Sequence, residues 1–573
     1  ANLPWDRFTI EQLAGDLLPD ASTSDRLATA FLRNHMINGE GGRIAEENRV
    51  EYVMDQAETV ATVWLGVTLT CCRCHDHKFD PFTQRDYYRM FAFFNQTSVE
   101  GKGGSGQTAP LVDLTSEAQR KERARLAAEY KRIVDLVAKQ EKELRKAATK
   151  DQDGKYTSTL PPLIETALST NPGARKAPNR QELLNYFNHS QPRYTALLGQ
   201  LEAARSTRDA FFLTSPQVMV MDERKQPRET FVLARGAYDK PGQKVSAGVP
   251  GHLPALQNTS KVNRLALGQW LVDGRNPLTA RVTVNRWWQT YFGTGLVKTA
   301  EDFGVQGERP SHPELLDWLA TELLATGWNS KAIQRQIVTS ATYRQSSKIS
   351  PALIERDPEN RLLARGPRYR LPAWMIRDQA LAASGLLVER LGGPAVKPYQ
   401  PEGIWEEATF GKIAYRQDHG DALYRRSLYI FWRRIVGPTM FFDVASRQAC
   451  TVKTARTNTP LHALVTLNDT TYAEAARALA QRVMQAAGST PRGRIEMAFR
   501  LCTSRRPTER ELGLLTKSFA RLDDLYRHDR PAAQRLIALG ESPRDNKLDA
   551  SEHAAYTALC SLILNLDETL SKQ

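Results

Sequence analysis

The segment Cys71-Cys72-Arg73-Cys74-His75 holds half of the six cysteines of this 573-residue chain. Three of its residues, Cys71, Cys74 and His75, have the spacing Cys-x-x-Cys-His, which is typical of c-type haem attachment. In such sites the two thiols bond covalently to the porphyrin vinyl groups and the histidine becomes an axial ligand of the iron. The spacing therefore predicts covalent haem c on Cys71 and Cys74, with the iron bound by His75.

Cations and further donors lie close to this motif in the sequence. Arg73, His77 and Lys78 are candidates for pairing with the haem propionates. His35 and Met36 are the nearest candidates for the sixth iron ligand. An open sixth position would favour catalysis, and a filled one would favour electron transfer.

Zinc is the alternative cofactor, because Cys72, Cys74, His75 and His77 are all donors that zinc accepts. A zinc site needs four ligands in a tetrahedron, and structural sites usually take two of them from elsewhere in the chain. The sequence has no second Cys-x-x-Cys and no His-x-x-x-His. We therefore favour haem over zinc.

The remaining cysteines, Cys450, Cys502 and Cys560, are far apart in the sequence. Their spacing is not that of a disulfide framework and predicts buried free thiols. Carboxylates recur every four residues at Glu47, Glu51 and Asp55, so they share one face of a predicted helix. That face is expected to be solvated, with a cation site or a proton relay as the alternative.

Bulk composition limits the class of protein. A hydrophobic content of 41% and a charged content of 25% are normal for a globular protein. No apolar run approaches the roughly 20 residues that span a bilayer, so no membrane span is expected. The net charge of +14 favours acidic partners such as an anionic polysaccharide, an acidic electron carrier or nucleic acid. No block of like charges indicates a nucleic-acid-binding arm.

Apolar residues recur at threes and fours over 46–69, over 116–147 and in most segments after residue 261, which predicts helices. Short apolar runs at 218–221 and 230–233 predict two strands, and a loop is expected over 241–254. The fold class is therefore mainly α with a small β element.

The same patterns divide the chain into three predicted domains. A multi-helix, cytochrome-like domain that binds the haem covers residues 1–110. A helical hairpin is inserted at 111–210, where two apolar stripes pair as antiparallel helices. A larger helical domain covers 211–573 and is expected to hold the substrate. A chain of this length is too long for one ordinary core.

The run TLTCCRCHDHKFDP at 68–81 resembles the signature of the planctomycete-type cytochrome c-like domain. Later stretches resemble the partner domain that follows it in the same large secreted proteins, among them NRWW at 285–288, SHPEL at 311–315 and RTNTPL at 456–461. The resemblance implies an extracytoplasmic haem protein, periplasmic or secreted, whose relatives carry modules that suggest redox work on carbohydrate. The family's first domain has a further segment before the stretch that opens this chain. Domain 1–110 is therefore expected to be N-terminally incomplete, with a second polypeptide as a candidate partner.

The C-terminal domain offers weaker candidates. Arg377 and Asp378 could orient substrate hydroxyls, and His462 could act as an acid or base. Arg425, Arg426 and Arg456 could bind sulfate or carboxylate groups. These are expected to form a platform for substrate.

The function expected from the sequence is that of a haem-dependent oxidoreductase. It would pass electrons from a substrate, plausibly a carbohydrate, to another c-type cytochrome or redox carrier. One alternative is a non-enzymatic electron-transfer or scaffold haem protein. The other is a zinc-stabilised protein that binds an acidic polymer.

Overall fold

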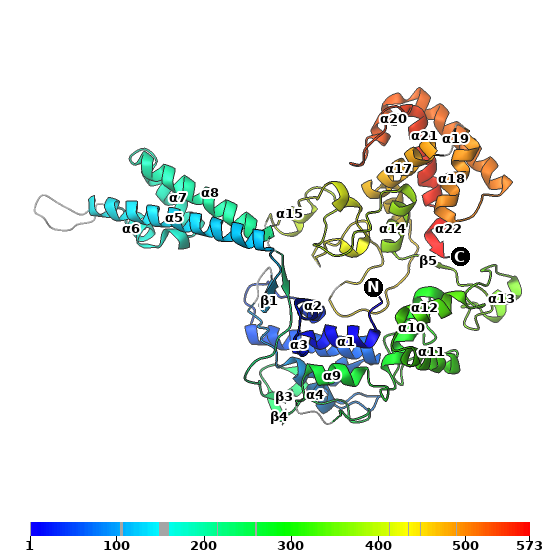
Figure 1. Ribbon diagram of the computed structural model, residues 1–573, viewed down its shortest axis with the longest axis horizontal. Coiled ribbons are helices and arrows are strands. Elements are labelled where there is room, and N and C mark those ends of the chain that lie inside the picture. The colour runs from blue at the N-terminus through cyan, green and yellow to red at the C-terminus, as the bar shows by residue number, and fades with distance from the viewer. Residues whose placement is uncertain are drawn as a thin grey trace, which may run out of the picture. The chain divides into compact units, whose positions relative to one another are not determined.

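The computed structural model describes residues 2–102, 107–147, 160–214, 216–257, 261–411, 413–433, 435–446, 448–486, 488 and 490–572. Gln107–Val220 form one compact unit, and Ala1–Gly106 with Met221–Gln573 form a second, larger one (Figure 1). Within the described residues, helices make up most of the regular structure and all named strands pair in two-stranded antiparallel sheets. The predicted mainly α fold with a small β element is therefore confirmed.

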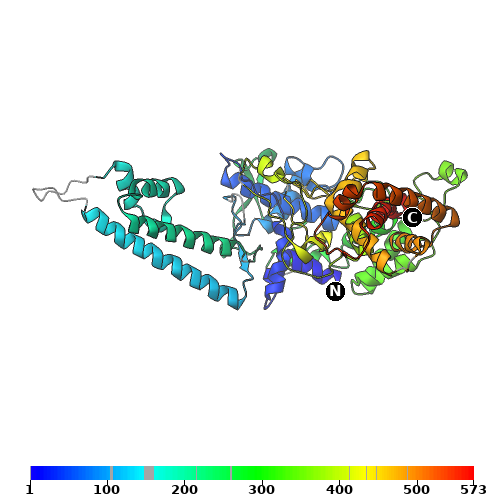
Figure 2. The ribbon, with the colours of Figure 1, turned by 90° about the horizontal axis from the view of Figure 1, so that it is seen from above.

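The smaller unit contains the segment predicted as an inserted hairpin. Its two long helices, α5 (Glu117–Ala147) and α8 (Pro192–Thr214), run side by side in opposite directions (Figure 2). The helices α6 (Pro162–Ser169) and α7 (Ala177–Phe187) lie between them in sequence and complete the same apolar core. Strands β1 (Leu111–Asp113) and β2 (Gln217–Met219) pair where the unit begins and ends.

A buried ion pair fixes the core of this unit. Both terminal nitrogens of Arg175 donate to the carboxylate of Glu141 at 2.6 Å, and the Tyr194 hydroxyl donates to the same carboxylate at 2.7 Å. Because these side chains are buried, removing Arg175 or Glu141 would leave a buried charge without its ion-pair partner.

The N-terminal part of the larger unit is a helical layer with one small sheet. Its core is formed by residues such as Val53, Ala57, Trp64, Tyr88 and Leu267. The elements are α1 (Trp5–Ala14), α2 (Thr23–Ala28), α3 (Ala45–Val60), α4 (Gln84–Phe94), β3 (Thr230–Leu233), β4 (Pro241–Val245) and α9 (Arg264–Leu271). The expectation of a loop over 241–254 was wrong for its first five residues, because β4 pairs with β3.

The rest of the larger unit is built from two further helical cores. The first contains α10 (Thr279–Phe292), α11 (Pro313–Ala325) and α12 (Ser330–Thr339). The second is centred on α21 (Ala550–Leu564), which packs against α17 (Thr470–Ala486), α19 (Glu509–His528) and α20 (Arg530–Ile537). The other elements are α13 (Pro351–Arg356), β5 (Tyr369–Arg370), α14 (Ala373–Ser384), α15 (Ile404–Ala408), α16 (Pro460–Asn468), α18 (Pro491–Thr503), α22 (Asp567–Leu570) and β6 (Ser571–Lys572).

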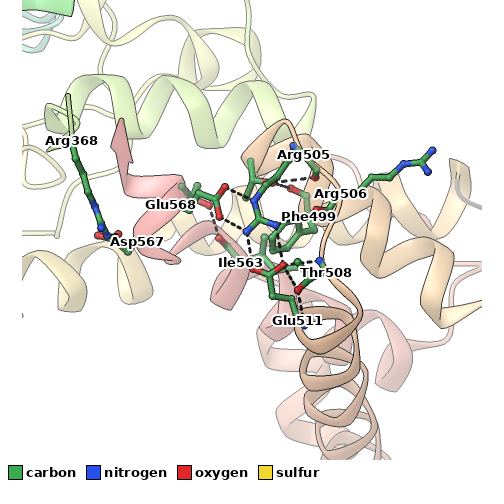
Figure 3. Close-up of polar contacts among 11 residues, drawn as sticks. Arg368, Phe499, Arg505, Arg506, Thr508, Glu511, Ile563, Asp567 and Glu568 are labelled. Atoms are coloured by element: carbon green, nitrogen blue, oxygen red, sulfur yellow. Dashed lines mark hydrogen bonds and ion pairs between the residues drawn. The ribbon is translucent and has the colours of Figure 1, made fainter. Parts of the chain in front are cut away.

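Arg505 joins three elements at the C-terminal end (Figure 3). It follows α18 and donates to Glu511 of α19 at 2.7 and 2.9 Å and to Glu568 of α22 at 2.6 Å. Glu511 also closes the capping box that begins α19, with Thr508 as its partner. The cluster therefore ties the start of α19 to the last helix of the chain.

Polar contacts hold the N-terminal helices against the later chain. Arg264 of α9 is fully buried and forms a two-pronged ion pair with Asp16, at 2.9 and 2.6 Å. Arg286 of α10 donates to the carbonyls of Thr62 and Val63, at the turn that follows α3. Most of the two predicted domains 1–110 and 211–573 thus belongs to one unit, whereas residues 107–110 and 211–220 belong to the smaller one. In the described parts of the chain, no helix has both the length and the apolar character needed to cross a bilayer.

Candidate functional site

The cysteine motif lies on a 3₁₀ turn, Leu69–Arg73, directly after the turn at Gly66. A 3₁₀ helix has about three residues per turn, so Cys71 and Cys74 lie on the same side of it. Both residues are exposed with free thiols, and the Cys74 thiol donates weakly to the Arg235 carbonyl at 3.3 Å. Cys72 is fully buried, and its thiol faces the Phe82 carbonyl at 3.5 Å. The turn therefore leaves the two thiols of the motif, Cys71 and Cys74, exposed and buries the thiol of Cys72.

His75 is exposed at the end of this turn. Its Nδ1 lies 2.7 Å from the Asp76 carbonyl, which can only accept a hydrogen bond. Nδ1 therefore carries the proton, and the lone pair of Nε2 is left for another group. This is the tautomer in which a histidine binds a metal through Nε2. Two exposed thiols on one side and an imidazole in this state fit the attachment of haem c.

The three predicted flanking cations differ in their surroundings. Arg73 forms an ion pair with Glu51 of α3. His77 is buried, and its Nδ1 accepts the backbone N–H of Asp80 at 2.9 Å. Lys78 is exposed, with its ammonium 5.0 Å from the centre of the Phe79 ring. Lys78 is therefore the cation of the three that is best placed to reach a propionate.

The four donors considered for zinc point into different environments. Cys72 and His77 are turned inward and bonded to backbone groups, whereas Cys74 and His75 are exposed. Among the residues that the structure describes, no three His, Cys, Asp or Glu side chains are grouped to hold a metal ion. The four donors therefore do not converge on one point.

The candidates for the sixth ligand, His35 and Met36, line a separate cavity of about 350 Å³. The α3 residues Asp55, Gln56 and Thr59 form one wall, and Ala445 with residues 448–451 of the later chain forms another. Cys71, Cys74 and His75 do not line this cavity. Ligation of the iron by His35 or Met36 stays a prediction that the structure does not support by proximity.

Hydrogen-bond acceptors gather in this cavity. Burial and the neighbouring Glu58 raise the pKa of Asp55 to about 6. Burial lowers the pKa of His35 to about 4, so its ring is neutral at pH 7. His35 donates from Nδ1 to the Met36 carbonyl at 3.0 Å, which makes Nε2 an acceptor. That Nε2 and the Gln56 Oε1 are buried and have no hydrogen-bond partner. The cavity therefore suits a ligand rich in donors, such as hydroxyl groups.

Cys450 completes the cavity on the side of the later chain. The expectation that it is buried was wrong, since Cys450 is exposed while Cys502 and Cys560 are buried. Desolvation raises the pKa of its thiol, and the Arg286 charge and the Thr59 hydroxyl offset part of that rise. Sequence reasoning missed Cys450 as a site residue because it is isolated in the sequence from the other residues of the cavity.

One face of α3 connects this cavity with the cysteine turn. Asp55 and Glu58 are three residues apart and therefore neighbours on the helix surface. Glu58 accepts hydrogen bonds from the Thr70 hydroxyl at 3.2 Å and from the Tyr87 hydroxyl at 2.7 Å, and Thr70 directly precedes Cys71. Glu51 on the same face pairs with Arg73. The carboxylate face therefore runs between the cavity and the predicted haem-attachment turn.

The predicted pair Arg377 and Asp378 supports a loop. Arg377 is fully buried and donates to the Arg425 and Leu423 carbonyls at 2.9 and 2.7 Å. Asp378 accepts from the backbone N–H and hydroxyl of Ser427 at 2.8 and 2.7 Å. Arg425 is fully buried as well and donates to carbonyls. These groups hold residues 423–427 in place, and none lines the cavity of Asp55.

The predicted acid–base residue His462 lies on α16. Its ring is buried and stacks on Phe442 with centroids 4.0 Å apart, and its Nε2 lies 3.9 Å from Asp443. His462 does not line the cavity of Asp55. A role in acid–base chemistry stays a prediction.

These observations define a mainly α protein with an exposed Cys-x-x-Cys-His turn and a separate acceptor-lined cavity, both in contact with the carboxylate face of α3. The family model PSCyt2, described as a protein of unknown function (DUF1549), matches residues 1–99. The family model PSD1, described as a protein of unknown function (DUF1553), matches residues 263–519. The two matches agree in order and position with the two parts of the chain that carry the sequence resemblance. No curated protein and no solved structure matches it.

Proposed function

We propose that this chain is an extracytoplasmic c-type haem oxidoreductase that oxidises a hydroxyl-rich substrate, such as a saccharide. Cys71 and Cys74 would hold the haem, and His75 would bind its iron. The observation that supports a catalytic role is the cavity of Asp55. Residues of the later chain line this cavity together with Asp55. Asp55 lies about one helical turn from Glu58, which accepts a hydrogen bond from Thr70, the residue before Cys71.

A haem attached at this turn would supply a one-electron acceptor next to the cavity. The chain's own residues would bind and deprotonate the substrate. His35 Nε2 and Gln56 Oε1 would accept hydrogen bonds from substrate hydroxyls. Asp55, whose pKa is raised to about 6, is ionised at neutral pH and would take a proton as a general base.

The reaction balances with an external oxidant. Oxidation of one hydroxyl to a carbonyl removes two electrons and two protons. Asp55 would take one proton and release it to solvent, and the second proton would go to solvent directly. Another c-type cytochrome would be the final oxidant, taking the electrons one at a time.

The test is the rate of haem reduction by neutral saccharides in haem-loaded protein. The rate should rise with pH through about 6, since only ionised Asp55 acts as a base. Asp55→Asn should slow reduction by roughly 10²-fold or more, which is the usual contribution of a general base. The control Glu47→Gln alters an exposed carboxylate on the same helix and should leave the rate unchanged.

Two results would contradict the proposal. If saccharides reduced the haem of the Asp55→Asn variant as fast as that of the native chain, Asp55 would not be the base. If none of the saccharides reduced the haem, the oxidoreductase function on carbohydrate would fail, and the electron-carrier alternative would gain support.

A further inference from the structure

A second cavity, of about 210 Å³, is lined in part by residues 452–456, which follow Cys450 closely in the chain. Arg286 of α10, Arg370 of β5 and the loop residues Lys453 and Arg456 all line it. Arg286 and Arg370 are partly buried, whereas Lys453 and Arg456 are exposed at the surface. Four cations around one small cavity repel one another, and a negative charge between them would offset that repulsion.

The partners of these four cations are neutral. Lys453 and Arg456 each donate to a backbone carbonyl, at 3.0 and 2.8 Å. Arg370 donates to the Asn458 side chain at 3.0 Å, and Arg286 donates to carbonyls. Within the described residues, none of the four forms an ion pair with a carboxylate. The Nε atoms of Arg286 and Arg370 are buried and have no hydrogen-bond partner.

Among the described residues that line the same cavity, one carries a carboxylate, Asp443. It already accepts hydrogen bonds from the backbone N–H and the hydroxyl of Thr457, at 2.6 and 2.7 Å. Burial lowers the pKa of Arg286 to about 10 and also lowers those of Arg370 and Arg456. All three remain charged at pH 7, so the cavity carries an excess of positive charge.

We infer that this cavity binds an oxyanion group, a sulfate ester or a carboxylate, carried by a saccharide. Guanidinium and ammonium groups form their strongest hydrogen bonds with such oxyanions. The cavity is below the roughly 300 Å³ at which drug-sized ligand pockets begin, so it fits one charged group better than a whole ligand. A duplex nucleic acid would instead need a row of cations along its backbone.

The remainder of the ligand has room next to this cavity. A neighbouring cavity of about 460 Å³ shares Arg456 with it and is also lined by Trp288, Phe292 and Tyr369. The Arg456 guanidinium lies 4.4 Å from the centre of the Tyr369 ring, so a cation and an aromatic face adjoin where the two cavities meet. Apolar ring faces beside hydrogen-bonding groups suit saccharide rings. The inference rests on this arrangement and does not depend on the haem.

Calorimetric binding at constant ionic strength tests the inference, with the full chain titrated by chondroitin sulfate, polygalacturonate, neutral dextran or duplex DNA. The native chain should bind at least one of the two acidic saccharides and not dextran, and inorganic sulfate should compete. Arg370→Gln and Lys453→Gln should each weaken binding by about tenfold or more, since each removes a charge-assisted hydrogen bond. Lys453 is exposed, so its variant should fold normally.

The matched control is Arg510→Gln, which removes an exposed charge on α19 and should bind as tightly as the native chain. Equal weakening in this control would show that binding follows the net charge alone and would overturn the inference. So would the absence of binding to both acidic saccharides. If duplex DNA bound the native chain as tightly as the acidic saccharides, and Arg370→Gln and Lys453→Gln abolished that binding, the assignment to a saccharide would be overturned.

Discussion

Replacing Asp55 by asparagine should stabilise the chain at neutral pH, although it removes a residue proposed to act in catalysis. Burial and Glu58 raise the pKa of Asp55 from 3.8 to about 6. Asp55 makes no hydrogen bond or ion pair with the described residues, so the Asp55→Asn substitution removes no polar contact with them. A carboxylate that destabilises the fold is a feature typical of functional sites.

The magnitude follows from proton linkage. The folded state binds the Asp55 proton more tightly than the unfolded state, so stability falls as the pH rises from about 4 to about 6. A shift of about two units corresponds to about 2–3 kcal/mol, at roughly 1.4 kcal/mol per unit. Above pH 6 the full penalty is present in the native chain and absent from Asp55→Asn. Below pH 4 the two proteins should be equally stable.

Urea denaturation of both proteins at pH 7.5 and at pH 4 measures this difference. At pH 7.5 the variant should unfold at the higher urea concentration, and at pH 4 the two transitions should coincide. Glu47→Gln, an exposed change on the same helix, should shift stability by no more than about 0.5 kcal/mol at either pH. Equal stability of native and Asp55→Asn protein at pH 7.5 would refute the reasoning, as would a gain that persisted unchanged at pH 4.

Three further predictions concern the fold. Asp16→Asn should destabilise the chain by about 2–3 kcal/mol in urea denaturation, because it removes the charge-assisted hydrogen bonds of the fully buried Arg264 and leaves its charge only the longer contact with Glu223, at 3.8 Å. Gly66→Ala should lower the melting temperature, because Gly66 has φ of +60° and an added Cβ would lie 2.9 Å from two side chains. Arg505 lowers the pKa of Glu511 to about 2, so their interaction stabilises the fold above pH 4.5 and is lost as the pH falls towards 2. Arg505→Gln should therefore cost about 1 kcal/mol at pH 7 and little at pH 2, as measured by urea unfolding at both pH values.

Local patterns were sufficient to predict the helices. The apolar spacing over 116–147 matches α5, because helical periodicity is set by residues three and four apart. The helix expected over 46–69 is shorter, since α3 ends at Val60 and a π-helical turn continues it only to Leu65. The strand β4 was missed because its sequence, Pro241–Val245, is polar and exposed along most of its length. Its pairing with β3, and not its composition, makes it a strand.

The candidate site was only partly accessible to sequence reasoning. The spacing of Cys71, Cys74 and His75 marked the turn, but it could not show that Cys72 faces the core. Asp55 was recognised only as part of a charged face. Cys450 lines the same cavity, although it lies far from α3 in the sequence and is brought next to it only by tertiary packing. Arg377 was misleading for the same reason, since its burial among backbone carbonyls is a tertiary property.

The mass of the denatured protein, produced together with a haem-maturation system, tests the central proposal most directly. Covalent attachment predicts a chain heavier by one haem, with a c-type band in its reduced visible spectrum. The added mass should be absent from a Cys71→Ser/Cys74→Ser variant and retained in Cys450→Ser, which removes the exposed thiol outside the motif. A native chain with its unmodified mass, or a double variant that kept the haem, would contradict the account.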